Sequence, residues 1–525
     1  MKKNETPPVP EDLLNLIPRN TENLCVVGKG AGQLLKSFSS FSSCVQGQEF
    51  LSGSDFLSGG IRDLDGLALL SGEEKTDFPA LFKEAKKSLK PKGALILQIP
   101  NPFCFGALES TDTRLETLPA KIQNWHSSLR KEAEKNGFHI DRQRWPGVKE
   151  PNGNNRLTRE TRGLPKFVMD SLHAPLLYLR FLMYKPEPLH FQAQVLKPVG
   201  GVNDVRITEP LAALATLPGV TAAISRNIPG KPVMDVERKI MILHRPILSL
   251  DNSLDAIKIL REQGYLILTE FDDHYSPWPG IEQNSFLSFA GVHAVQTTTP
   301  TLAEVLKEFN PEIGIFPNQL AALPDEEEKN PAEKVRVFFG ALNREKDWAP
   351  LIPALNSMLK EIGSRIEFEI VFDQTFFKAL ETDQKNFTPQ CPYDVYKSKL
   401  AGADIALMPL QDTLFNRMKS DLKFVEAAGF GAVPVASPVV YENCDPSGDF
   451  SILCKQPDDF ANAIRKLVMD RGKLQKMQER ARHYVRDNRL LCAHLAHRQN
   501  WYEDLLKRRA ELDQALERRL KAIIP

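Results

Sequence analysis

Charged residues of both signs interrupt a short apolar segment near residue 420. The segment SDLKFVEAAGFGAVPVAS, residues 420–437, places Lys423 and Glu426 three positions apart, and Arg417 and Lys419 come just before them. Residues three apart share one face of a helix. Cations at a helix start favour a phosphate, and a carboxylate can accept hydrogen bonds from the hydroxyls of a ribose. The spacing predicts a nucleoside diphosphate site; the alternative is a surface ion pair between Lys423 and Glu426.

The elements that must position these residues are a strand, a loop and a helix. Residues 403–409, ADIALMP, are typical of a buried strand, and residues 410–419 of a loop. We expect the helix to begin near Asp421, with Ser420 as its N-cap residue. Ligands of open parallel sheets bind beyond the carboxyl ends of the strands, where loops lead into helices. We therefore expect the phosphates to bind at this loop.

Short apolar runs alternate with helical patterns along most of the 525 residues. This alternation is typical of parallel sheets with crossover helices, and the length fits about three domains. We predict an α/β fold of three Rossmann-like parallel-sheet units. The predicted parts are a first unit at 1–150, a linker with an apolar helix at 151–189, a second unit at 190–325, a third at 326–485 and a helical tail at 486–525, whose last helix should be solvated.

Composition limits the class of protein and of partner. Hydrophobic residues make up 42% and charged residues 26%, and 67 basic residues balance 67 acidic ones, which gives no support to a nucleic-acid partner. Seven scattered cysteines and a polar start without a signal-peptide pattern indicate a cytoplasmic protein. The most apolar stretch, Leu172–Tyr184, is too short to span a membrane. We interpret it as a buried or docking helix, with peripheral membrane contact as the alternative.

The segment around Lys423 resembles the donor-site helix of GT-B glycosyltransferases, in particular those of retaining family four. KSDLKFVEAAGFGAVPVAS follows the family pattern of Lys/Ser-x-Lys-x-x-Glu-Ala, small residues and then Gly-x-Pro-Val. Other segments agree in order: VGGVNDVRITEPLAAL, TTTPTLAEVL, IGIFPN and VRVFFGALNREKDWAPLIPAL. The resemblance covers about residues 190–485, and it implies an acceptor domain at 190–325 and a donor domain at 326–485.

The resemblance also implies which residues bind the donor. A glycine pair at 200–201 would let the backbone approach the ligand closely, Lys346 would meet the pyrophosphate, and Glu426 would hold the ribose. The full expected set is Gly200, Gly201, Gly340, Arg344, Lys346, Arg417, Lys419, Ser420, Lys423 and Glu426. Two positions depart from the family: Met418 replaces a sugar-contacting glutamate, and Ala341 replaces an arginine for which Arg344 is the candidate substitute.

The segment LILTEFDDHY lies where many family members have a strand that ends in a histidine–aspartate pair. Aligning the strand ends makes Asp272, Asp273 and His274 the catalytic candidates, near the reacting carbon or the acceptor hydroxyl. A metal site and a helix cap are the alternatives for these residues. The resemblance implies a reaction without metal or other cofactor.

The first unit contains a second possible nucleotide site. In CVVGKGAGQLL, Gly28, Gly30 and Gly32 follow a strand, as in nucleotide-binding turns. LKPKGALILQIPN resembles a segment of class I S-adenosylmethionine-dependent methyltransferases, which implies S-adenosylmethionine as a possible ligand and Glu49 as the candidate ribose carboxylate. Because LCVV lacks the acidic residue common before the glycine turn in that family, the pattern favours a unit that keeps the sheet as an interaction or acceptor-presenting module, and active methyl transfer is the alternative.

These patterns together favour a glycosyltransferase that moves a sugar from a nucleotide-sugar donor, with retention, to a glycan, lipid-linked or protein acceptor. One alternative is a bifunctional methyltransferase and glycosyltransferase. The other is a non-catalytic scaffold whose nucleotide sites have decayed, which Met418 and Ala341 favour.

Overall fold

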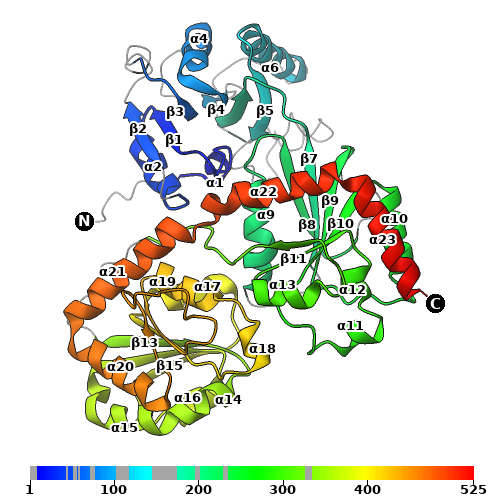
Figure 1. Cartoon of the computed structure of the whole chain (residues 1–525). Coiled ribbons are helices and arrows are strands. Elements are labelled where there is room, and N and C mark those ends of the chain that lie inside the picture. The colour runs from blue at the N-terminus through cyan, green and yellow to red at the C-terminus, as the bar shows by residue number, and fades with distance from the viewer. Residues whose placement is uncertain are drawn as a thin grey trace, which may run out of the picture. The chain divides into compact units, whose positions relative to one another are not determined.

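The computed structural model describes residues 9–42, 45–50, 56, 60–70, 77–101, 118–144, 174, 176–195, 201–228, 234–325 and 334–524. Its contacts divide the chain into two units: Met1–Glu187 with Ala215–Val220, and Pro188–Leu214 with Thr221–Pro525. The described part contains three six-stranded sheets, one in the first unit and two in the second (Figure 1). The predicted α/β class and its three sheet units are confirmed. Most of the predicted linker, residues 151–173 and 175, lies outside the described residues.

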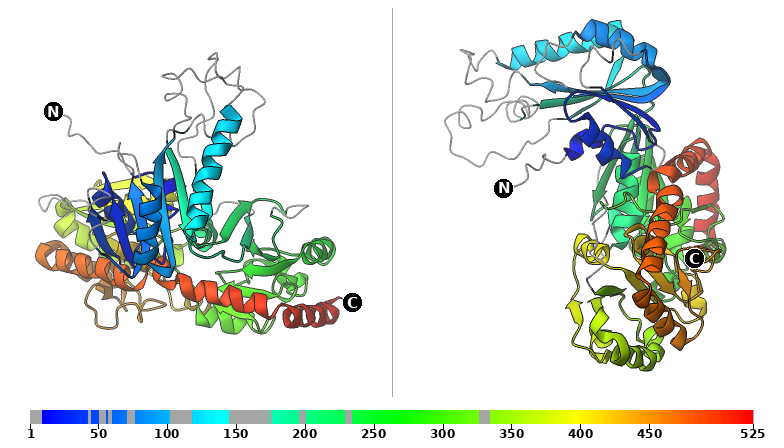
Figure 2. Two further views of the ribbon diagram at one scale, coloured as in Figure 1. Left: turned by 90° about the horizontal axis from the view of Figure 1, so that it is seen from above. Right: turned by 90° about the vertical axis from the view of Figure 1, so that its left-hand side faces the viewer.

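The first sheet has the strand order β2-β1-β3-β4-β6-β5. Its strands are β1 (Asn23–Val27), β2 (Gln46–Phe50), β3 (Leu64–Leu70), β4 (Leu89–Pro100), β5 (His139–Arg144) and β6 (Leu176–Leu182). Apolar residues of α4 (Phe78–Ser88) and α6 (Leu118–Lys135) cover one face, and those of α1 (Glu11–Leu14) and α2 (Ala31–Ser39) cover the other (Figure 2). The sheet is mixed rather than fully parallel, because β6 runs antiparallel to β4 and β5.

Strand β6 corrects the prediction of an apolar helix between residues 172 and 184. Leu177, Leu179 and Phe181 join the core on one face of the sheet, and Tyr178 and Leu182 join the core on the other. A strand that is covered on both faces reads as a continuous apolar run, and such a short run does not distinguish strand from helix. The described residues 177–182 are therefore part of the core rather than a membrane-docking surface. Among the described residues, no helix has the length and apolarity to cross a membrane.

The second sheet has the order β12-β11-β10-β9-β7-β8, and we call the structure built on it the N-lobe. Its strands are β7 (Leu189–Val195), β8 (Val220–Ser225), β9 (Arg238–His244), β10 (Tyr265–Glu270), β11 (Ala294–Thr297) and β12 (Ile313–Ile315). Its helices are the π-helix η2 (Asp204–Thr208), α9 (Glu209–Leu214), α10 (Leu254–Glu262), α11 (Pro279–Gln283), α12 (Leu287–Ala290) and α13 (Pro300–Leu306). Strands β7, β9, β10, β11 and β12 are parallel, so their carboxyl ends lie at one edge.

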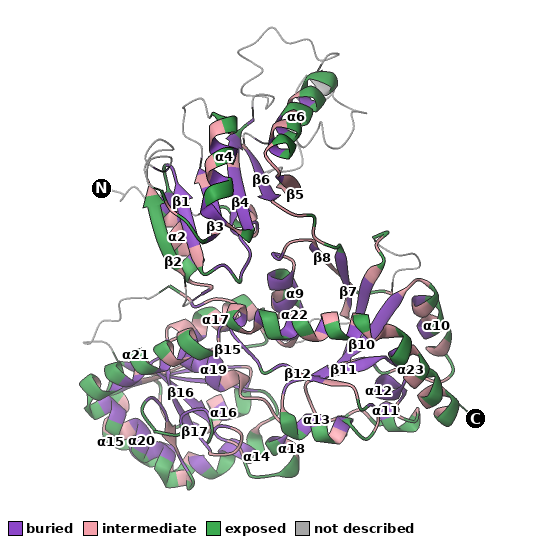
Figure 3. Ribbon diagram, turned by 45° about the horizontal axis from the view of Figure 1, so that its top comes forward, coloured by how far each residue is buried: buried purple, intermediate pink, exposed green. Residues whose placement is uncertain are grey.

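The third sheet is parallel throughout, with the order β15-β14-β13-β16-β17-β18, and we call this part the C-lobe. Its strands are β13 (Val335–Gly340), β14 (Ile366–Val371), β15 (Lys385–Thr388), β16 (Ile405–Met408), β17 (Val433–Ala436) and β18 (Ile452–Leu453). Its helices are α14 (Glu345–Trp348), η3 (Ala349–Leu351), α15 (Ile352–Ile362), η4 (Gly363–Arg365), α16 (Gln374–Ala379), α17 (Tyr393–Ala401), α18 (Leu414–Arg417), α19 (Leu422–Gly429), α20 (Pro457–Met469) and α21 (Arg471–Asn488). The four inner strands, β14, β13, β16 and β17, are mostly buried, and the helices around them have exposed outer faces (Figure 3).

The last two helices return to the N-lobe, as the red end of the ribbon shows (Figure 1). In α22 (Leu491–Lys507), the Tyr502 hydroxyl donates a hydrogen bond of 2.6 Å to Gln296. In α23 (Arg509–Ile523), Leu512 and Leu516 are buried, and Arg509 donates to the carbonyl of Gly264. The expectation that the last helix is solvated was wrong, because its apolar face packs on the N-lobe.

Candidate functional site

A cavity of about 220 Å³ lies where strands of the N-lobe and of the C-lobe end. Arg245 follows β9, Asp272 and Asp273 follow β10, and Gly340 and Met408 are the last residues of β13 and β16. The carboxyl edge of a parallel sheet is where ligands of such folds bind. The cavity therefore has the position that the sequence predicted for a ligand site.

The charges around this cavity favour an anion. Among the described residues, four cationic side chains line it, namely Arg245, Arg344, Lys419 and Lys423, against the two carboxylates of Asp272 and Asp273. The rest of the lining is mostly apolar or aromatic and includes Phe338, Phe339, Tyr396, Leu407, Leu422 and Tyr441. The surplus of cations matches a ligand that carries about two negative charges and an apolar or aromatic group.

Lys423 is held at the end of β13. Its Nζ atom donates to the carbonyl oxygen of Gly340, so the first strand of the C-lobe fixes the ammonium group at the cavity wall. Burial lowers the pKa of Lys423, while the neighbouring carboxylate of Glu426 raises it. Burial also lowers the pKa of Lys419, whose Nζ lies 3.5 Å from Asp273. An anionic ligand would favour the charged form of both lysines.

The start of α19 differs in detail from the prediction. The N-cap residue is Asp421 rather than Ser420, and Asp421 forms an ion pair of 2.7 Å with Arg489. The hydroxyl of Ser420 instead accepts a hydrogen bond of 2.8 Å from Asn318, on the segment after β12, and Ser420 lines the cavity. The shift by one residue leaves the helix N-terminus beside the cavity.

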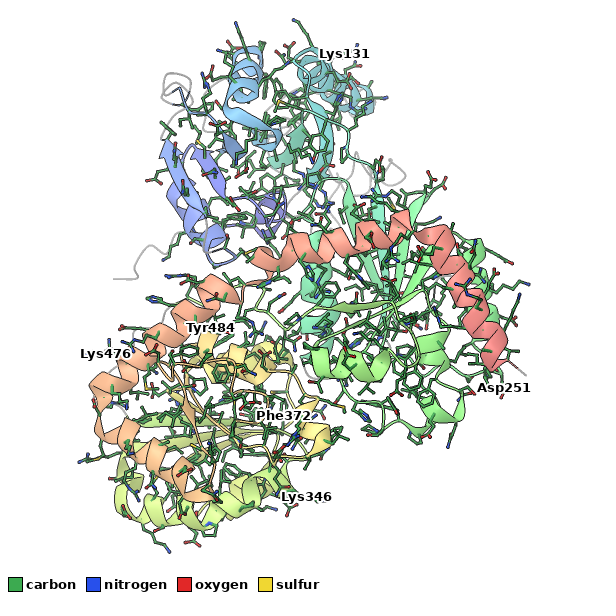
Figure 4. All side chains as sticks on the ribbon, in the orientation of Figure 1. Lys131, Asp251, Lys346, Phe372, Lys476 and Tyr484 are labelled. Atoms are coloured by element: carbon green, nitrogen blue, oxygen red, sulfur yellow. The ribbon has the colours of Figure 1, made fainter. Side chains whose placement is uncertain are left out.

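Of the other predicted cations, only Arg344 lines the cavity. Its guanidinium donates to Asn416 at 3.0 Å and lies 3.2 Å from Asp347, which fixes its position. Arg417 is exposed and paired with Asp412 at 2.5 Å. Lys346 is exposed on α14 (Figure 4), and neither residue is among the described residues that line the cavity. Sequence proximity did not distinguish these cations, because the turn of α18 directs Arg417 to the surface.

The three catalytic candidates have different surroundings. Asp272 accepts a hydrogen bond of 2.6 Å from Arg245, and although burial raises its pKa, Arg245 and Arg206 lower it below the usual value. Asp273 lines the cavity beside Lys419. His274 is not among the described lining residues, and its Nδ1 lies 2.9 Å from the hydroxyl of Ser276. Asp272 is therefore an ion-pair partner rather than a ready proton acceptor.

Arg245 is a site residue that the sequence analysis missed. It has a left-handed backbone conformation, with φ of 45°, directly after β9. Its guanidinium bonds Asp272 and lies 5.6 Å from the ring of Trp278. Strained backbone in a non-glycine residue is common at functional sites. The signal in the sequence was an arginine just after the apolar run IMIL, residues 240–243, because parallel sheets present ligand-binding groups from the ends of such strands.

Glu426 lies behind the cavity wall instead of on it. The carboxylate is 3% exposed, and its Oε1 accepts a hydrogen bond of 2.6 Å from the hydroxyl of Tyr393. Burial raises the pKa of Glu426 to about 7, while Tyr393 and Lys423 lower it. The predicted partner of a ribose is thus engaged by a side chain of α17 in this structure.

The glycine pair at residues 200–201 is only half described. Gly200 lies outside the described residues. Gly201 has φ of 81°, and a Cβ added there would lie 2.7 Å from the ring of Tyr393. The close approach that the glycine permits is therefore to an aromatic ring of the C-lobe.

The residues predicted for S-adenosylmethionine gather at one turn of the first unit. Gly28 follows β1 with φ of 110°, and a Cβ there would lie 2.0 Å from the carbonyl oxygen of Leu70, so no other residue fits. Gly30 is the N-cap residue of α2. A Cβ on Gly32 would lie 2.7 Å from a carboxylate oxygen of Glu49 on β2. The carboxylate thus lies beside the glycine turn.

No protein-family model matches this sequence, and no curated protein matches it. The fold is similar to those of several solved structures. A glycosyltransferase from Rickettsia africae is 15% identical with a TM-score of 0.44, and the match covers 61% of this chain and 100% of that one. HepE from Anabaena, in complex with UDP and glucose, is 14% identical with a TM-score of 0.41, covering 60% and 98%. The pneumococcal O-GlcNAc transferase GtfA, in complex with UDP and GlcNAc, is 14% identical with a TM-score of 0.37.

The match to GtfA covers 51% of this chain and 57% of GtfA. The chain therefore spans little more than half the length of that structure.

Proposed function

We propose that this protein transfers a sugar from a nucleotide-sugar donor to an acceptor hydroxyl. The observation that supports the proposal most directly is the cavity at the strand ends of the two lobes, whose described lining includes four cations, two carboxylates and several aromatic side chains. A diphosphate would bind the cations, and a base would pack against apolar side chains such as Phe338 and Leu407.

Charge stabilisation is the chemistry that these cations can supply. When the bond between the sugar carbon and the diphosphate oxygen breaks, negative charge develops on the leaving diphosphate. Lys419, Lys423 and Arg344 are positioned by their neighbours before the reaction, so they can stabilise that charge without reorganisation. The proposal includes a reaction that needs no metal or other cofactor, since ammonium and guanidinium groups would carry this role.

The proposal extends to retention of configuration at the sugar carbon. Inversion needs a base at the acceptor hydroxyl, whereas Asp272 is hydrogen-bonded by Arg245 and Asp273 lies 3.5 Å from the ammonium of Lys419, so both carboxylates are paired with cations. The acceptor would be a glycan, a lipid-linked glycan or a protein side chain that reaches Asp273 at the N-lobe side of the cavity. We also propose that this sugar transfer takes place in the cytoplasm.

Binding of nucleoside diphosphates tests this function. Isothermal titration with UDP, GDP and dTDP should give binding for at least one of them. Lys423→Ala and Lys419→Ala should each weaken that binding about 10-fold or more, because a hydrogen bond to a charged group is lost. The control is Lys360→Ala, which alters a lysine that is 73% exposed and pairs with Glu381 on the C-lobe surface. Absence of binding by all three nucleotides, or equal affinity of the four proteins, would contradict the proposal.

A second candidate function depends on the position of Glu49. Its carboxylate lies beside the glycine turn of the first unit, where it could accept hydrogen bonds from ribose hydroxyls. We infer S-adenosylmethionine as the candidate ligand and methyl transfer as the candidate reaction of that unit. Binding of S-adenosylmethionine to this unit would distinguish a methyl-transfer function from a purely structural role of the first sheet.

A further inference from the structure

Tyr393 occupies one oxygen of the Glu426 carboxylate. The tyrosine is the first residue of α17, and its hydroxyl donates to Oε1 of Glu426 at 2.6 Å. Lys397, one turn further along α17, places its Nζ 4.4 Å from the centre of the Tyr393 ring. The phenol is therefore held by a specific hydrogen bond and by its neighbours.

The cavity ends just in front of this pair. Lys423 and Tyr396 line the cavity, whereas Glu426 and Tyr393 are not among its described lining residues. The rings of Tyr393 and Tyr396 are stacked, with centroids 6.1 Å apart and an angle of 22° between them. A ligand whose diphosphate is held by Lys423 would have Glu426 within one helical turn, outside the described lining of the cavity.

The same tyrosine contacts the N-lobe. Gly201 lies against its ring so closely that an added Cβ would be 2.7 Å away. Next to it, Lys397 of α17 lies 3.6 Å from the carboxylate of Glu209 on α9. Any movement of the Tyr393 ring therefore changes contacts between the two lobes.

We propose that the hydroxyl group of Tyr393 competes with the ribose of the donor for the carboxylate of Glu426. This hydroxyl holds the carboxylate oxygen that would otherwise accept a hydrogen bond from the ribose diol, and donor binding displaces it. The inference rests on the proposed function, because it needs a nucleoside diphosphate in the cavity. Displacement also loosens the contact of α17 with Gly201, so donor binding and lobe movement are coupled.

Tyr393→Phe tests the inference by removing only the hydroxyl group. Displacing the Tyr393 hydroxyl costs free energy, so the apparent affinity for the ligand should rise when this hydroxyl is removed. The affinity of the protein for UDP, or for whichever diphosphate binds the wild type, should increase about 5- to 20-fold in isothermal titration. The matched control is Tyr502→Phe, which also removes a buried phenol hydrogen bond of 2.6 Å, to Gln296 in the N-lobe. That variant should show unchanged affinity.

The diol supplies a second readout. The 2′-deoxy form of the same nucleotide has one hydroxyl fewer for Glu426, so its affinity should rise less than about 3-fold in Tyr393→Phe. Binding by the wild type with equal or weaker binding by Tyr393→Phe would overturn the inference and leave the proposed function standing. An equal gain for both nucleotides would also overturn it. Absence of nucleotide binding in every protein would overturn both.

Discussion

Arg206 and Glu270 form a buried ion pair in the N-lobe. Arg206, on η2, donates to both oxygens of Glu270, at 2.8 and 3.1 Å, and to the carbonyl oxygen of Phe316. A buried pair with its hydrogen bonds satisfied fixes the elements that carry it. Arg206 and Glu270 thus join η2 to β10, whereas Arg245 and Asp273, which follow the ends of β9 and β10, line the cavity.

His244 makes the stability of the N-lobe depend on pH. The side chain is 5% exposed at the end of β9, and among the described residues its Nε2 has no hydrogen-bond partner. Burial lowers its pKa from 6.5 to about 4, with Arg245 and Arg206 acting in the same direction and Asp272 against it. The folded state therefore resists protonation that the unfolded state accepts below pH 6.5. Stability from this group is present above that pH and lost as the pH falls towards 4.

Substitution of His244 by asparagine should remove the loss of folding stability that the wild type shows at low pH. Urea unfolding at pH 7.5 and pH 4.5 should show that the free energy of unfolding of the wild type falls by about 2–3 kcal/mol more than that of His244→Asn, since one pKa unit corresponds to about 1.4 kcal/mol. His483→Asn alters an exposed histidine and should keep the wild-type difference. Parallel pH profiles of all three proteins would show that His244 does not titrate as described.

At the scale of elements, the sequence predicted what depends on local spacing. The strands around Lys423 and the glycine turns at Gly28 and Gly201 followed from apolar runs and short motifs. The strand β6 was missed because both of its faces are buried. The contact of Tyr393 with Glu426 spans 33 residues and the contact of Arg245 with Asp272 spans 27. Such contacts arise from the order of strands in the sheet, which no local pattern contains.

Helix α23 offers a prediction about an element that sequence patterns left ambiguous. Its charged residues suggested a solvated helix, yet Leu516 is fully buried. Leu516→Ala should lower the free energy of unfolding by about 2–4 kcal/mol, because it leaves a cavity in a packed interface. Arg518→Ala, on the exposed face of the same helix, should change it by less than about 0.5 kcal/mol. Equal unfolding midpoints of the two variants in urea would place α23 in solvent after all.

At the scale of the whole molecule, each of the two units has its own core. One pair of apolar clusters is built on the two faces of the first sheet, and separate clusters belong to the second and third sheets. Units with their own cores can unfold as separate transitions. A ligand that binds only the folded form of one unit raises the apparent stability of that unit by mass action.

Calorimetry with two ligands should therefore separate the two proposed sites. A nucleoside diphosphate at 100 times its dissociation constant should stabilise the second unit by about 2.7 kcal/mol and leave the transition of the first unit unchanged. S-adenosylmethionine should shift only the first unit, and Glu49→Ala should abolish that shift because the carboxylate beside Gly32 is removed. Hydrogen exchange assigns each transition to its unit through peptides of β1 and β13.

A shift of the first unit by the diphosphate would contradict the assignment of the diphosphate to the cavity at Lys423. Absence of any shift with S-adenosylmethionine would leave the first unit with a structural role, since its glycine turn would then serve only the close packing of β1 against Leu70.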